Sequence, residues 1–127
     1  MNHFIMRLIE ILITLPVILI SLSVHELCHG FAAYRLGDPT AKSMGRLSMN
    51  PLKHIDPFGF IALIFFKIGW AKPVVVDSRF FKKPKRDMAI TALAGPVSNV
   101  LAAMLGYFVF YSVVAFVPIH SETAFRV

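Results

Sequence analysis

The sequence predicts a mainly α-helical, polytopic membrane protein, and three observations support this fold class. Hydrophobic residues make up 57% of the 127 positions and charged residues 16%, whereas soluble domains carry about 25% charged residues. Residues 88–119 contain no Asp, Glu, Lys or Arg. Residues 11–24 form a second charge-free run. Because about 20 apolar residues cross a bilayer as a helix, we expect two long transmembrane helices around these runs.

The first predicted transmembrane helix covers residues 4–36, which is long enough to span the bilayer. Gly37-Asp38-Pro39 is typical of the end of a helix, and Pro16 favours a kink inside it. The apolar character continues to Ala33, and no small-residue cleavage site follows a basic start. We therefore interpret this segment as a retained helix and not as a signal peptide.

The chain between the two long helices predicts three short elements. Residues 45–50 alternate polar and apolar side chains and precede Pro51, which favours a short strand. Residues 58–66 are apolar but too few to cross as a helix, so we expect a re-entrant or interfacial segment. Residues 72–77 indicate a second strand, and Pro73 suits a strand edge or start. The two strands are expected to form a small membrane-associated pair.

The positive charges predict the topology. Four basic residues lie between the first helix and the short apolar segment, and six lie just before the last helix, whereas Arg7 and Arg126 are the basic residues near the two ends. By the positive-inside rule, both inner loops are expected in the cytoplasm and both termini on the other side. The net charge of +6 is therefore better explained by topology and lipid head groups than by nucleic acid.

The residues that carry chemistry are His25-Glu26-Leu27-Cys28-His29. On a helix, residues four apart share a face, so His25 and His29 can bind one metal ion together. Glu26 lies beside that face and can act as the base toward a water molecule that the ion activates. Zinc suits this chemistry because it lowers the pKa of water to about 7 and polarises a carbonyl group.

The alternative for this motif is a polar cluster that packs against another helix. An ionisable residue costs about 3 kcal/mol or more near the centre of the bilayer. Three such residues on one turn have no basic partner nearby in the sequence, and a bound cation would satisfy all three. The metal site is therefore the favoured hypothesis.

Further polar residues have weaker claims to function. Asn99, in the last helix, would either position a substrate or make a hydrogen bond across helices, and we favour the hydrogen bond. Gly95 belongs to a stripe of small residues that suits close approach to the first helix. His54 and Asp56 lie in a proline-rich basic loop, where they more often hold a turn than bind a metal.

Several motifs, in one order, resemble the site-2 protease family of intramembrane zinc metallopeptidases, in its short prokaryotic branch. They are residues 25–30 with 34–41, residues 45–57, residues 69–74, and Leu93-Ala94-Gly95-Pro96-Val97-Ser98-Asn99, and together they cover about residues 22–106. The resemblance implies zinc on His25 and His29, Glu26 as the catalytic base, and cleavage of transmembrane protein substrates in regulated intramembrane proteolysis. It also implies a multi-pass protein of a prokaryotic plasma membrane. With the topology above, the active site is expected to open to the cytoplasm.

The resemblance further implies a third zinc ligand, an aspartate that precedes a glycine on a later core helix. The sequence contains no Asp-Gly pair, so we expect residues 1–127 to form one incomplete metallopeptidase core. Two alternatives stay open: a non-catalytic membrane protein that binds or transports metal, and an inactive docking fragment. Transport predicts more intramembrane carboxylates than Glu10 and Glu26, which favours the peptidase. The oligomeric state is left open.

Overall fold

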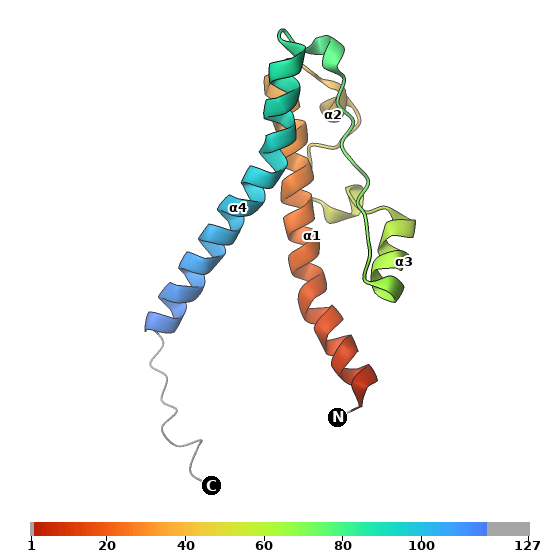
Figure 1. The fold of residues 1–127 in the computed structure, drawn as a ribbon, viewed down its shortest axis with the longest axis vertical. Helices are drawn as coiled ribbons and strands as arrows, with labels where there is room; N and C mark the ends of the chain where they lie inside the picture. Colours follow the sequence, from red (N-terminus) through yellow and green to blue (C-terminus); the bar gives the residue numbers. More distant parts are fainter. Residues whose placement is uncertain (1, 117–127) are drawn as a thin grey trace.

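The structure is a computed structural model, and it describes residues 2–116. Two helices of 33 residues dominate it: α1 (His3–Arg35) and α4 (Pro84–Phe116). Both are long and apolar enough to cross a membrane. They pack together where α1 ends and α4 begins, and they diverge toward their other ends (Figure 1). The predicted mainly helical fold with two long apolar helices is confirmed.

The C-terminus of α1 is a Schellman motif. The N–H of Asp38 donates to the carbonyl of Ala33 (2.9 Å), and the N–H of Gly37 donates to the carbonyl of Tyr34 (3.1 Å). Gly37 has φ of 113°, a conformation that glycine adopts without a Cβ penalty. The helix therefore ends at Arg35, and the chain turns sharply into α2 (Thr40–Ser43).

The chain between the long helices descends beside α1 and then returns. After η1 (Pro51–Lys53), α3 (Pro57–Phe66) begins at Asp56, whose side chain accepts the N–H of Gly59 at 2.8 Å. From Lys67 the chain runs back, mostly extended, to η2 (Ser78–Phe80) and the start of α4 (Figure 1). With ten residues, α3 is too short to cross a bilayer as a helix, and its placement as a re-entrant or interfacial segment stays a prediction.

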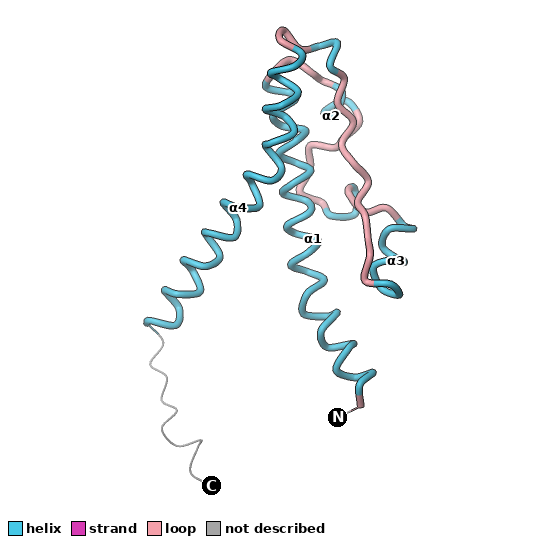
Figure 2. Tube along the Cα trace, viewed as in Figure 1, coloured by secondary structure: helices cyan, strands magenta, loops and turns pink. Residues whose placement is uncertain are grey.

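The predicted pair of strands is wrong. Within residues 2–116 the chain forms helices, turns and loops but no strand (Figure 2). Residues 45–50 turn instead of extending, with Gly45 at φ 68° and the N–H of Ser48 donating to the carbonyl of Arg46. One isolated antiparallel bridge is present in this part of the chain, and it joins Ile55 and Ala71, which lie outside both predicted strands.

Residues 72–77 are extended, but two of their backbone donors bind side-chain carboxylates, which no strand supplies. The N–H of Lys72 donates to the carbonyl of His54, and the N–H of Val74 donates to the carboxylate of Glu26. The N–H of Asp77 donates to the carboxylate of Asp38. Side-chain acceptors from α1 and its C-terminal turn therefore take the place of a neighbouring strand.

Many of the buried positions of the described chain carry polar side chains. Glu26, Asp38, His54, Asp87 and Thr91 are all at most 9% exposed, whereas the side chains of Leu, Ile and Phe on α1 and α4 point largely outward. This inverted distribution is expected where lipid covers the outside of a protein, because buried polar groups then satisfy one another inside. Two of these residues, Glu26 of α1 and Thr91 of α4, lie together where the two long helices meet.

Candidate metal centre and active site

Two histidines on α1 point their outer ring nitrogens at each other. His25 and His29 are one helical turn apart, and their Nε2 atoms lie 3.0 Å from each other. The two rings meet edge to face, with centroids 4.6 Å apart. Two potential metal-binding nitrogens therefore converge on one point at the contact between α1 and α4.

The inner nitrogen of His29 is held by the backbone of α4. Its Nδ1 lies 2.7 Å from the carbonyl oxygen of Thr91. A carbonyl oxygen can only accept, so Nδ1 carries the proton and donates it. In the neutral ring, Nε2 of His29 then carries a lone pair, which is the form that binds a metal.

The inner nitrogen of His25 is held by side chains. Nδ2 of Asn99, from α4, lies 3.1 Å from Nδ1 of His25, and Oδ1 of Asn99 accepts from the hydroxyl of Ser21 at 3.2 Å. With the amide in this orientation, Nδ1 of His25 accepts, so Nε2 carries the proton and donates to His29. A half-turn of the Asn99 amide would offer Oδ1 to Nδ1–H and leave the lone pair on Nε2. The Ser21 hydroxyl both donates and accepts, so it suits either orientation.

Gly95 of α4 makes room for the two rings. A Cβ atom at Gly95 would overlap Nε2 of His29 and would lie 2.6 Å from Nε2 of His25. Any larger residue would therefore fill the space in front of both nitrogens. Gly95 thus contacts the two nitrogens that point at each other, and it also lets α1 and α4 approach closely.

Glu26 lies next to the histidine pair and is buried, with 9% of the residue exposed. Its Oε2 accepts the backbone N–H of Val74 at 3.0 Å. A cavity of about 510 Å³ adjoins Glu26 on the side of His25 and Asn99. A second cavity, of about 220 Å³, adjoins it on the side of His29 and Val74. Space for a ligand therefore exists on both sides of the carboxylate.

The residues present fit part of a zinc site. Two imidazole nitrogens are ligands that zinc prefers, and the missing side chain of Gly95 is what lets both rings lie against α4. Catalytic zinc sites have three protein ligands as a rule. Among residues 2–116 no group of three His, Cys, Asp or Glu side chains is arranged to hold an ion. The described chain therefore offers two of the usual three ligands.

The other sequence candidates lie elsewhere or play other parts. His54 is fully buried, and its Nε2 is 2.7 Å from the carbonyl of Ser48. Asp56 caps α3. Both residues therefore stabilise turns and are not placed to bind a metal with the histidine pair. Cys28 is a half-buried free thiol.

Sequence reasoning missed four contributors to the site: Ser21, Thr91, the backbone N–H of Val74, and Asp38. Thr91 and Val74 act through backbone atoms, which carry no residue-type signal. Ser21 lies four residues before His25, on the same helix face, and this spacing was the one available hint. The sequence marks Asp38 as part of a helix end, but its carboxylate also binds Asp77, 39 residues away.

Fold and site together define a helical membrane protein with a histidine pair and a glutamate on one turn of its first long helix. The model of peptidase family M50 matches residues 13–126, and the chain belongs to this family. The chain is 48% identical over 91 residues to "Putative zinc metalloprotease YwhC" of Bacillus subtilis, covering 72% of this chain and 42% of that protein.

A second relative comes from another bacterial genus. "Putative zinc metalloprotease Rip2" of Mycolicibacterium smegmatis is 32% identical over 123 residues, covering 84% of this chain and 47% of that protein. The chain thus spans less than half the length of the curated relatives described here. No solved structure matches the chain.

Proposed function

We propose that this chain is the zinc-binding part of an intramembrane metalloendopeptidase that cleaves transmembrane protein substrates. His25 and His29 hold the metal through Nε2, and Glu26 is the catalytic base. The observation that carries the proposal is the convergence of the two Nε2 atoms, 3.0 Å apart, beside the buried carboxylate of Glu26. Membership of family M50 and the names of the two relatives support the same chemistry.

Zinc bound at the two histidines supplies a Lewis acid for the scissile carbonyl and lowers the pKa of a water molecule. Glu26 accepts a proton from the attacking water as the new C–O bond forms, and it returns this proton to the leaving amine nitrogen as the C–N bond breaks. The N–H of Val74 binds Oε2, and the other carboxylate oxygen, which lacks this donor, is proposed to take the proton. Thr91 and Asn99 orient the two rings for their task.

The site is proposed to open toward the cytoplasm of a multi-pass protein in a prokaryotic plasma membrane. Of the 13 Lys and Arg residues, Arg7 and Arg126 alone lie outside residues 35–86. The end of α1, α2, η2 and the start of α4 lie together at one end of the molecule (Figure 1). His25 lies ten residues before the end of α1, about 15 Å along the helix at 1.5 Å per residue. Water from the cytoplasm therefore has a short path to it.

Zinc analysis of the detergent-purified chain tests the proposal. We expect near-stoichiometric zinc in the unsubstituted chain and in Glu26→Gln, and loss of zinc in the double variant His25→Ala/His29→Ala. Glu26→Gln should also abolish cleavage of a transmembrane reporter in cells that express the complete native polypeptide containing the chain. Equal, negligible zinc in all three proteins would contradict the proposed metal site. Cleavage by Glu26→Gln at the unsubstituted rate would contradict the proposed base.

A further inference from the structure

An extended segment, residues 72–77, lies against α1 beside the candidate site. Irregular backbone at membrane depth is tolerated where protein groups satisfy its polar atoms. Three backbone N–H groups of this segment are satisfied in that way, those of Lys72, Val74 and Asp77. The Val74 N–H is bound by Glu26, so the position of the segment decides whether the catalytic carboxylate keeps this donor.

The packing around Val74 permits the hydrogen bond from its N–H to Glu26 but leaves the residue partly exposed. Val74 is half-buried and Val75 is 47% exposed. A Cβ atom at Gly30 would lie 3.4 Å from Cγ1 of Val74, so the segment approaches α1 closely at this point. One side of Val74 faces the 220 Å³ cavity that also adjoins Glu26. Local packing alone therefore leaves the segment free to move outward, and its ends must hold it.

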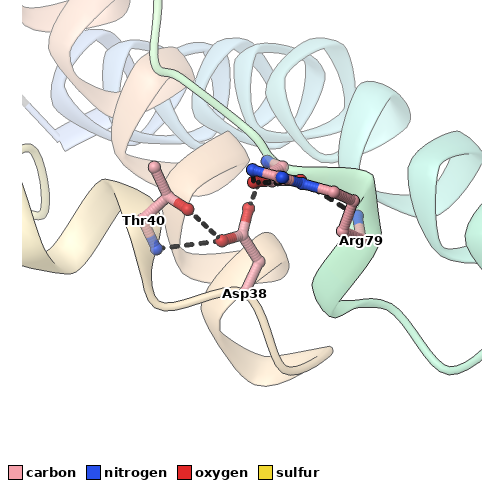
Figure 3. A network of polar contacts seen from close by, with 4 residues as sticks. Asp38, Thr40 and Arg79 are labelled. Carbon is pink, nitrogen blue, oxygen red and sulfur yellow. Dashed lines mark hydrogen bonds and ion pairs between the residues drawn. The ribbon is translucent and has the colours of Figure 1, made fainter.

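Asp38 holds the end of the segment nearest α4. This residue is fully buried, directly after the C-terminal turn of α1. Its Oδ2 accepts the N–H of Asp77 at 2.7 Å. Its Oδ1 accepts both the N–H and the hydroxyl of Thr40, at 2.9 and 2.5 Å (Figure 3). The Thr40 contacts fix the carboxylate, and the fixed carboxylate then binds the segment.

The buried position makes this contact strong. Hydrogen bonds to a charged acceptor are about twice as strong as neutral ones, and a buried carboxylate has no water to replace its donors. If Asp38 served only to cap α2, its hydrogen bonds to Thr40 would be sufficient. The second oxygen of Asp38 is turned to a segment 39 residues away in the sequence, which is more than helix capping needs.

We propose that Asp38 is a positioning residue for the catalytic carboxylate. It anchors Asp77, and three residues of extended chain then set the Val74 N–H on Oε2 of Glu26. This contact keeps Glu26 in one orientation, with its other oxygen available as the base. The inference rests on the proposed function of Glu26. The contacts themselves can be tested without proteolysis.

Site-resolved amide hydrogen exchange on the detergent-purified chain tests the anchor. Asp38→Asn keeps the shape of the side chain but replaces one acceptor by a donor, so it cannot bind both Thr40 and Asp77. We expect exchange at Asp77 and at Val74 to become about tenfold faster, as loss of a hydrogen bond to a charged group implies. The amide of Lys72, bound to the carbonyl of His54, should keep its rate. Zinc content should stay at the unsubstituted value.

Two matched variants separate the anchor from a local structural role. Thr40→Val removes the hydroxyl donor but keeps the N–H of residue 40 on Oδ1 of Asp38. This N–H still fixes the carboxylate for Asp77, so exchange at Val74 should not change. Asp56→Asn makes the same chemical change at the cap of α3 and should also leave Val74 unchanged. If Asp38 were only a cap, Asp38→Asn would release Asp77 or Thr40 and leave Val74 protected. That result would overturn the proposal.

A further variant covers the case in which Asp38→Asn does not fold. Asp38→Ser retains a side-chain oxygen for the N–H of Thr40 but is too short to reach Asp77. Selective release of Val74 and Asp77 in this variant supports the anchor, and protection of Val74 overturns it. Failure of the proposed metal site would appear separately, as absence of zinc from the unsubstituted chain.

Discussion

At the scale of single residues, Gly95 has the clearest requirement in the site. A Cβ atom at this position would overlap Nε2 of His29 and crowd Nε2 of His25. We predict that Gly95→Ala pushes the rings apart and weakens zinc binding about tenfold or more, the size of effect seen when groups around a metal ligand are disturbed. Titration of the chain with zinc against a competing chelator measures this.

Gly106 provides the matched control for Gly95. It lies on the same helix, and a Cβ atom there would meet nothing within 4 Å. Gly106→Ala should therefore leave zinc affinity unchanged. It should not harm folding either, because alanine is the better helix former by about 1 kcal/mol. Equal zinc affinity of Gly95→Ala and Gly106→Ala would contradict the role given to Gly95.

Asn99 is predicted to control which nitrogen of His25 carries the proton. Asn99→Leu removes both amide atoms, so His25 loses the partner of Nδ1, and zinc affinity should fall roughly 10- to 100-fold. Asn99→Asp places an acceptor beside Nδ1 and favours the lone pair on Nε2, so this variant should bind zinc as well as the unsubstituted chain or better. Chelator competition measures both. Equal affinities for Leu and Asp at position 99 would show that the amide does not act on His25.

The three motif residues could be predicted because their relation is local. A spacing of four places His25 and His29 on one helix face in any α-helix. The partners of the two rings could not be predicted in the same way. Asn99 is 74 residues from His25, and Thr91 is 62 residues from His29. These contacts exist only because α4 packs against α1 in one register.

At the scale of elements, η2 is stabilised by a charge pair that depends on pH. The side-chain and backbone donors of Arg79 hold the pKa of Asp77 at about 2, below its ordinary value of 3.8. The ion pair spans 2.6 Å, from Nη2 of Arg79 to Oδ2 of Asp77. Because the pKa is lowered in the folded turn, the ionised form of Asp77 favours folding. This contribution is complete above about pH 4 and is lost as pH falls toward 2.

We predict that the Arg79 Nε–H signal in an NMR titration shifts with a midpoint near pH 2. The signal should be constant from about pH 4 to 7, and in Asp77→Asn it should not titrate at all between pH 2 and 5. A midpoint at the ordinary value of 3.8 would mean that Arg79 and Asp77 are not paired in solution.

The helices and the failed strands differ in where their hydrogen bonds go. A helix satisfies its backbone internally, so apolar length and end signals predicted α1 and α4 to within a few residues at the ends that the structure describes. A strand makes its backbone hydrogen bonds to a neighbouring segment, and the pattern of its own side chains does not predict which segment that is. Residues 72–77 have the extended shape that their sequence favours, yet their donors bind Glu26, Asp38 and the carbonyl of His54.

At the scale of the whole molecule, the charges predict orientation. Single cysteines at Ser43 and at Asn2, both exposed positions, in a Cys28→Ala background report the two sides. Asn2→Cys should react with an impermeant maleimide in intact cells. Ser43→Cys should react with it only after the cells are permeabilised. This outcome follows from the cluster of basic residues at the end where α1 and α4 meet. Labelling of Ser43→Cys in intact cells would place the candidate site on the opposite side.

The sequence by itself determined the fold class, the length of the two membrane helices and the histidine–glutamate motif. Each of these depends on residues close together in the chain or on the thickness of the bilayer. Tertiary structure decided which groups hold the two histidine rings, what binds Glu26, and that residues 72–77 pair with no strand. These features join groups 39 to 78 residues apart, and a contact between distant residues is set by how α1, α4 and the returning segment pack, which no local pattern records.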